Sequence, residues 1–231
     1  MNSRWIDIAA APGETFTGYL ALPPTGHGPG IVLVQEIWGV NEHIRAVADQ
    51  YALAGYVVLA PDIFWRLEAR VDLPYDEAGT AKARGFLQKV DTALAVADVG
   101  SAVDTLRQSP EVSGKIATLG FCLGGQIAYR AAAAGKPDAA VAYYGGGIQN
   151  HLDVADKVRQ PILFHYAGQD AHIPPSAVAE VKARFAGKAD ATFFDYPAAE
   201  HGFNCWGRPL YDQRAAALAH GRTLIFLAQH L

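Results

Sequence analysis

A cysteine lies at the centre of a glycine-rich turn, GFCLGG at residues 120–125. A run of β-branched and apolar residues precedes this turn and a helix-forming stretch follows it, so the sequence predicts a sharp strand-to-helix corner. Ester-cleaving enzymes often carry Gly-x-Ser-x-Gly at such a corner, with the serine as nucleophile. Cys122 takes the place of that serine, and the start of the next helix would stabilise its thiolate. The alternative is a small, buried and unreactive cysteine.

A cysteine nucleophile needs a base and a group that orients the base. Where a nucleophile occupies such a corner, the chain order is nucleophile, acid, histidine. Asp170 and His201 fit this order, because each comes soon after a predicted strand. His172 is the local rival of His201, although it is two residues from Asp170 and precedes the last strand. Three other histidines do not fit the order: His27, His151 and His165.

Glu36 ends the apolar run IVLVQE and therefore lies at the same edge of the predicted sheet. We predict that it belongs to the site; the alternative is a solvated carboxylate at a strand end. Two backbone N–H groups, those of Ile37 and Leu123, are placed to donate to an oxyanion, as in the loops that supply this group in α/β-hydrolases.

The elements that must position these residues follow from periodicity. Two alternating runs around Pro12 and Gly13 predict an antiparallel hairpin. The remaining strand-like runs are 30–36, 56–62, 115–121, 139–145, 161–168 and 191–197. Helical patterns fill about 41–54, 81–106, the stretch after Cys122, 175–187 and 211–229, and 63–80 is irregular. Strands alternating with helices predict one doubly wound, mostly parallel sheet over residues 1–231, with ligands at the carboxyl ends of the strands.

Composition narrows the function classes. The 231 residues are 51% hydrophobic and carry a formal net charge of −4, so no basic surface indicates nucleic acid or an anionic membrane. The start of the chain lacks the features of a signal peptide, and no apolar run reaches the length of a membrane span. With two cysteines, the sequence offers neither a disulfide framework nor a zinc site. We expect a cytoplasmic monomer that acts on a small molecule and uses no metal or cofactor.

These residues and their surroundings resemble the dienelactone hydrolases (carboxymethylenebutenolidases) of the α/β-hydrolase fold. The blocks VQEIWGVNEHIR, GYVVLAPDIF, GKIATLGFCLGGQIAYRAA, AVAYYGGGI, PILFHYAGQDAHIP and YPAAEHGFN match that family in order, over essentially the whole chain. The resemblance implies an α/β-hydrolase fold with an N-terminal hairpin and a triad of Cys122, His201 and Asp170. It also implies that Glu36 hydrogen-bonds the resting thiol and helps to ionise it when substrate arrives.

The chain departs from this family where the family holds the substrate's carboxylate with two arginines. Cys205 stands at one of these places, four residues after the histidine, and gapless alignment puts Thr80 at the other. Lys82, Arg84 and Arg208 are nearby in sequence and are candidate substitutes. Cys205 itself is expected to be structural or exposed.

The sequence therefore predicts a hydrolase that cleaves carboxylic esters or enol lactones through a cysteine nucleophile and a thioester. Activated esters suit a thiolate better than amides do. Because the family's arginines are missing, we expect neutral aryl esters to be cleaved at least as well as dienelactone. The alternatives are a broad carboxylesterase and a non-catalytic relative that binds a small ligand. Four aromatic residues are candidate pocket walls: Trp38, Phe64, Tyr143 and Trp206.

Overall fold

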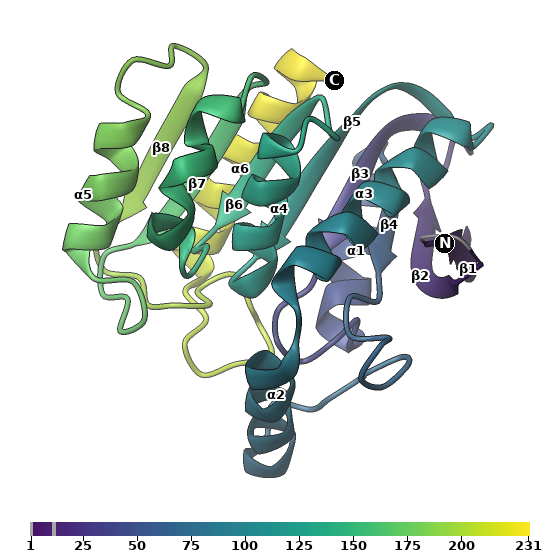
Figure 1. The fold of residues 1–231 in the computed structure, drawn as a ribbon, viewed down its shortest axis with the longest axis horizontal. Helices are drawn as coiled ribbons and strands as arrows, with labels where there is room; N and C mark the ends of the chain where they lie inside the picture. The colour runs from purple at the N-terminus through teal and green to yellow at the C-terminus, as the bar shows by residue number, and fades with distance from the viewer. Residues whose placement is uncertain (1, 11–12) are drawn as a thin grey trace.

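The computed structural model describes residues 2–10 and 13–231. Its eight strands form one sheet in the order β1-β2-β4-β3-β5-β6-β7-β8 (Figure 1). The strands are β1 (Asn2–Ala9), β2 (Thr15–Leu22), β3 (Gly28–Val34), β4 (Val57–Pro61), β5 (Val112–Phe121), β6 (Ala139–Tyr143), β7 (Ile162–Ala167) and β8 (Ala191–Tyr196). This order makes β3 and β5 neighbours although β4 lies between them in the chain.

The strand directions confirm the predicted mostly parallel sheet. β1 pairs antiparallel with β2, and β2 antiparallel with β4, whereas all pairs from β4 to β8 are parallel. The predicted N-terminal hairpin is therefore confirmed, although Pro12 in its turn lies outside the described residues. The sheet is that of an α/β fold with one antiparallel edge.

Helices cover both faces of this sheet (Figure 1). They are α1 (Glu42–Leu53), α2 (Glu77–Lys89), α3 (Thr92–Gln108), α4 (Leu123–Ala133), α5 (Pro175–Arg184) and α6 (Gln213–His230), with the 3₁₀ segment η1 (Ile148–Lys157). The side chains of β3 alternate between the two layers: Ile31 and Leu33 pack in the cluster that contains α1, whereas Val32 and Val34 pack in the cluster that contains α3. Both layers are apolar, which explains why β3 reads as a continuous apolar run.

The single helix expected over about 81–106 is wrong, because the chain forms α2 and α3 with a break between them. Val90 is extended (φ −64°, ψ 128°), and the Asp91 carboxylate accepts hydrogen bonds from the N–H groups of Ala93 and Leu94. Asp91 is therefore the N-cap of a new helix, a signal that the apolar periodicity on either side conceals. No helix in the described part of the chain combines the length and apolarity needed to span a membrane.

Candidate active site

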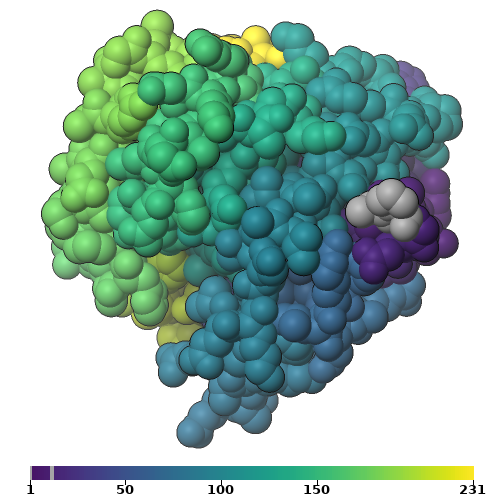
Figure 2. Space-filling model, in the orientation of Figure 1, coloured from purple at the N-terminus to yellow at the C-terminus, as the bar shows by residue number. Residues whose placement is uncertain are grey.

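The sheet reverses its winding between β3 and β5, since β4 lies on one side of β3 and β5 on the other. Ligands of such sheets bind at this switch point, beyond the carboxyl ends of the strands. Glu36 follows β3 at this place and Cys122 follows β5. α2 and the segment before it project beyond this edge of the molecule (Figures 1 and 2).

Cys122 adopts a backbone conformation that L-residues rarely take, with φ 55° and ψ −118°. Its N–H donates to the carbonyl of Tyr143 at 3.0 Å, which fixes the turn against β6. The neighbouring glycines are required by close approach: a Cβ on Gly120 would lie 2.0 Å from the Gly124 carbonyl oxygen, and a Cβ on Gly124 would lie 2.3 Å from that of Val34. A strained conformation costs about 1–3 kcal/mol, so the turn is held by its surroundings.

His201 and Asp170 form a buried pair. His201 Nδ1 donates to Asp170 Oδ2 at 2.7 Å, and the side chains are 7% and 1% exposed. The other carboxylate oxygen, Oδ1, accepts from the backbone N–H groups of His172 and Ile173 at 2.8 and 3.0 Å. These bonds fix the carboxylate and, through it, the imidazole of His201. His172 engages Asp170 with its backbone and not with its ring.

Cys122 and Asp170 both act on the pKa of His201. Burial opposes the charged imidazolium, but hydrogen-bonding and charge contributions from Asp170 and Cys122 outweigh it and raise the pKa of His201 to about 10. Burial and the charge of His201 lower the pKa of His172. Of the two histidines, only His201 bonds to the Asp170 carboxylate through its ring, and only its pKa is raised.

Glu36 is buried, and neither of its carboxylate oxygens has a hydrogen-bond partner among the described residues. Burial raises the pKa of Glu36, whereas the charges of Arg208 and His201 oppose that rise. Arg208 Nη1 lies 3.8 Å from Glu36 Oε1, and its guanidinium lies over the ring of Trp38 at 4.7 Å. Arg208 is therefore the candidate cation that the structure brings into the site.

Each of the two expected oxyanion donors directly follows a residue of the candidate site: Ile37 follows Glu36, and Leu123 follows Cys122. Leu123 is the first residue of α4, where N–H groups have no partner within the helix. Ile37 directly follows Glu36, and within the described chain neither of these two N–H groups donates a hydrogen bond. Both N–H groups are therefore available to donate a hydrogen bond to an oxyanion.

Two of the four expected pocket walls are wrong. The Tyr143 hydroxyl lies 2.7 Å from Thr223 Oγ1 in the core, because alternation along β6 directs this side chain toward α6. Phe64 is fully buried and stacks on Phe86 with ring centroids 5.2 Å apart. The residue that sequence reasoning missed is Tyr144, whose ring meets that of His201 at 5.1 Å.

The other two walls lie beside a cavity of about 470 Å³ next to the site. Trp206 lines it and is 45% exposed, with its ring 4.2 Å from that of His43. Trp38 is buried and contacts Tyr75, another lining residue, at 5.1 Å between ring centroids. Tyr75 was also missed, because it comes from the irregular segment before α2.

The remaining sequence candidates are distributed between the surface and the site. Lys82 is exposed and bonded to Glu68 at 2.8 Å, so it does not serve the site in this arrangement. Arg84 is exposed on α2, within electrostatic range of His172. Cys205 is fully buried, as the structural alternative predicts, and burial raises the pKa of its thiol to about 12.

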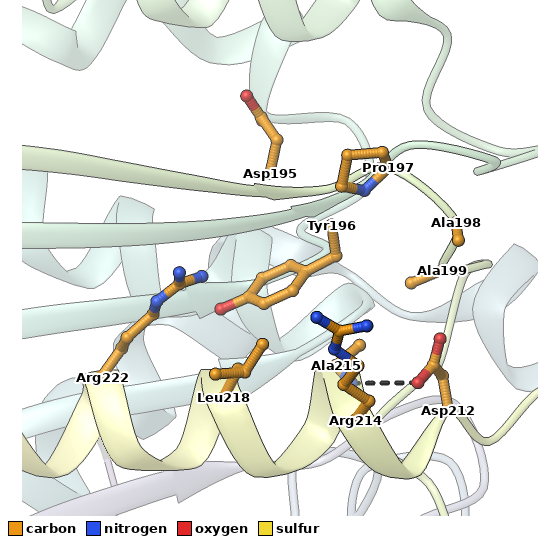
Figure 3. Close-up of a pocket in the computed structure, with 10 residues that line it drawn as sticks. All are labelled: Asp195, Tyr196, Pro197, Ala198, Ala199, Asp212, Arg214, Ala215, Leu218 and Arg222. Carbon is orange, nitrogen blue, oxygen red and sulfur yellow. Dashed lines mark hydrogen bonds between the residues drawn. The ribbon is translucent and has the colours of Figure 1, made fainter.

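A second cavity, of about 310 Å³, lies between the end of β8 and α6 (Figure 3). Tyr196, Pro197 and Leu218 supply its apolar lining, and Arg214 and Arg222 extend from α6 toward it (Figure 3). None of the predicted catalytic side chains lines this cavity, so we place the site at the switch point. In the described residues no group of three or more His, Cys, Asp or Glu side chains could hold a metal ion.

Sheet order and strand-end residues together define the class of protein. A mostly parallel eight-stranded sheet, a nucleophile-type corner after β5, an acid after β7 and a histidine after β8 are the arrangement of an α/β-hydrolase.

Comparison with known proteins narrows the class to a family. The model of the dienelactone hydrolase family matches residues 16–231. A carboxymethylenebutenolidase of Pseudomonas putida is 34% identical over 229 residues, which cover 99% of this chain and 97% of the relative. One of Cupriavidus pinatubonensis (strain JMP 134 / LMG 1197) is 29% identical, with the same coverage. The chain belongs to the dienelactone hydrolase family and is a hydrolase of carboxylic esters or lactones.

Solved structures agree with this assignment. A proposed dienelactone hydrolase from Klebsiella pneumoniae subsp. pneumoniae superimposes with a TM-score of 0.86 at 29% identity, and all of both chains is covered. A dienelactone hydrolase-like promiscuous phosphotriesterase from metagenomic libraries gives 0.82 at 25% identity, covering 99% of this chain and 98% of the other. The fold predicted from the sequence is confirmed.

Proposed function

We propose that the protein hydrolyses carboxylic esters and enol lactones with Cys122 as nucleophile and a thioester as intermediate. The observation that carries this proposal is the buried pair of Asp170 and His201, joined at 2.7 Å, together with the half-buried Cys122, which contributes with Asp170 to raising the pKa of His201 to about 10. A thiolate beside an imidazolium is the reactive form of a catalytic cysteine.

The chemistry proceeds in two halves. The Cys122 thiolate attacks the carbonyl carbon, and the N–H groups of Ile37 and Leu123 donate to the oxyanion; a single such donor contributes about 3 kcal/mol to catalysis. The C–O bond breaks as the intermediate collapses, and the departing oxygen takes a proton from His201. The neutral imidazole then removes a proton from water, which attacks the thioester and releases the acid. Asp170 holds the tautomer of His201 throughout.

Arg208 and Glu36 bear on the choice of substrate. The guanidinium is largely buried, and its Nη1 has no hydrogen-bond partner among the described residues. A substrate carboxylate would satisfy Arg208 and release Glu36 toward Cys122, which the family resemblance implies. This favours a lactone that carries a carboxylate.

A neutral ester is the second candidate substrate, and it is favoured by Cys205 and Thr80 at the family's arginine positions. The Arg208→Gln variant distinguishes the two candidate substrate classes, and Lys82→Gln, on the exposed surface of α2, is the control. If Arg208 holds a carboxylate, kcat/KM for dienelactone falls at least tenfold more than that for a neutral aryl ester. Equal losses for both substrates would leave the neutral ester as the substrate class.

The nucleophile is tested by Cys122→Ala against Cys205→Ala, which removes the other, fully buried thiol. Hydrolysis of an aryl ester should disappear in the first variant and persist in the second. Retention of most activity in Cys122→Ala would contradict the mechanism.

A further inference from the structure

Tyr144 shares an unusual backbone conformation with Cys122. In the described chain, three residues other than glycine have a positive φ: Arg70, Cys122 and Tyr144. Tyr144 has a φ of 36°, which is rare for a bulky side chain, although glycines follow directly at 145 and 146. The strain lies next to the nucleophile, because the N–H of Cys122 bonds to the carbonyl of Tyr143. Strained residues of this kind concentrate at functional sites.

The Tyr144 hydroxyl is buried and has no hydrogen-bond partner among the described residues. Burial raises the pKa of Tyr144 well above its ordinary value, and the charges of Glu36, Cys205 and Cys122 add to that rise. The phenol is therefore neutral and remains a donor, and it lies among the groups of the site. A donor left without an acceptor is costly in the resting protein, so an acceptor is expected in another state.

A role limited to packing explains the ring but not the hydroxyl. The Tyr144 ring meets Phe203 at 5.2 Å and Phe121 at 6.0 Å, and a phenylalanine would fill that space without burying an unpartnered O–H. Tyr166 also carries a buried hydroxyl without a partner, but among its neighbours are Asp195 and Tyr129, outside the site. A buried hydroxyl without a partner is therefore not sufficient to assign a role. Tyr144 differs from Tyr166 because it also has a strained backbone and lies against the ring of His201.

The position of Tyr144 selects the acceptor. In the proposed mechanism the oxyanion already accepts hydrogen bonds from the N–H groups of Ile37 and Leu123. Tyr144 lies instead against the ring of His201, with ring centroids 5.1 Å apart. His201 is the group that protonates the departing oxygen. Both hydrogen-bonding side chains thus border one region beside Cys122.

We propose that Tyr144 is a further catalytic residue that donates a hydrogen bond to the departing oxygen of the ester or lactone as its bond to the acyl carbon breaks. This inference rests on the proposed cysteine mechanism. The phenol keeps its proton, and His201 delivers the proton that neutralises the leaving group. This hydrogen bond should contribute most when the leaving oxygen is strongly basic and keeps its negative charge localised, as in phenoxide, and least when the charge is delocalised, as in p-nitrophenoxide.

The experiment compares Tyr144→Phe with Tyr166→Phe on aryl acetates of graded leaving-group acidity, from p-nitrophenyl to phenyl. Tyr144→Phe should lower kcat/KM for phenyl acetate at least tenfold and that for p-nitrophenyl acetate less than threefold. Tyr166→Phe should leave both values within twofold of the unmodified protein. Because the substitution removes a buried hydroxyl without a partner in the described chain, Tyr144→Phe should melt no lower than the unmodified protein, so a loss of rate cannot be attributed to a loss of folding.

A uniform loss across the aryl acetates, or no loss, would overturn the role of Tyr144 in leaving-group departure. Alkylation by iodoacetamide keeps this outcome distinct from failure of the cysteine mechanism. That mechanism fails if complete alkylation of Cys122 leaves turnover intact. It stands, and only the Tyr144 role falls, if alkylation abolishes turnover while the Tyr144→Phe rates show no dependence on the leaving group.

Discussion

Replacing Asp170 by asparagine should change both the rate and the pH dependence of stability. The substitution keeps the shape of the side chain but removes the charge that accepts from His201 at 2.7 Å. The amide introduced by Asp170→Asn would hold the imidazole in the wrong tautomer or leave it unbonded, and in a related triad this change lowers kcat by about 10⁴-fold. We expect a loss of at least about 100-fold in kcat with the fold retained.

The stability effect follows from the pKa of His201. Because that pKa is raised from 6.5 to about 10 in the folded protein, the stabilisation is fully present below about pH 6.5. It is lost as the pH rises from there through about 10. The full shift corresponds to about 5 kcal/mol, shared between Asp170 and Cys122, and a charge-assisted hydrogen bond supplies about 2 kcal/mol of it.

Thermal melts at pH 6, 8 and 10 measure this difference. A change of about 2 kcal/mol corresponds to about 4–8 °C in Tm for a chain of this length. The Tm of the unmodified protein should therefore fall more steeply between pH 6 and 10 than the Tm of Asp170→Asn, by about that amount. Parallel pH profiles would show that Asp170 does not hold the proton on His201, and the reasoning would be refuted.

Two other substitutions test the choice of histidine and the geometry of the turn. His201→Ala should lower turnover at least about 100-fold, since it removes the acid of the first half-reaction and the base of the second, whereas His172→Ala should cost far less; equal losses would reverse the choice. Gly124→Ala places a Cβ 2.3 Å from the Val34 carbonyl oxygen and should lower Tm by about 4 °C or more, whereas Gly146→Ala meets no atom within 4 Å. Similar Tm values for the two variants would contradict the close approach at the turn.

The fold was predictable because its signals are local. Continuous apolar runs gave the parallel strands, and the turn at Cys122 gave the strand-to-helix corner that places a residue at the switch point. The rule that ligands bind beyond the carboxyl ends of strands then selected Glu36, Asp170 and His201 without knowledge of their contacts. The break at Asp91 was missed because an N-cap inside a long helical pattern resembles a surface residue.

The walls of the site were less predictable because they depend on orientation. Tyr143 and Tyr144 are adjacent and identical in type, and only the backbone of the turn decides that the first enters the core and the second meets His201. The position of Arg208 could not be predicted from the sequence either. Its distance from His201 in the sequence does not match the family's arginine, yet its guanidinium lies 3.8 Å from Glu36. Such positions are set by the path of a loop, which periodicity does not encode.

Mass spectrometry of the quenched reaction tests the cysteine mechanism most directly. With p-nitrophenyl acetate and His201→Ala, in which the base for thioester hydrolysis is gone, an acetyl group should accumulate on the peptide that contains Cys122. Cys205, buried with a pKa raised to about 12, should remain unmodified. Acetyl label on another residue, or turnover by the unmodified protein after Cys122 has been fully alkylated, would contradict a thioester on Cys122.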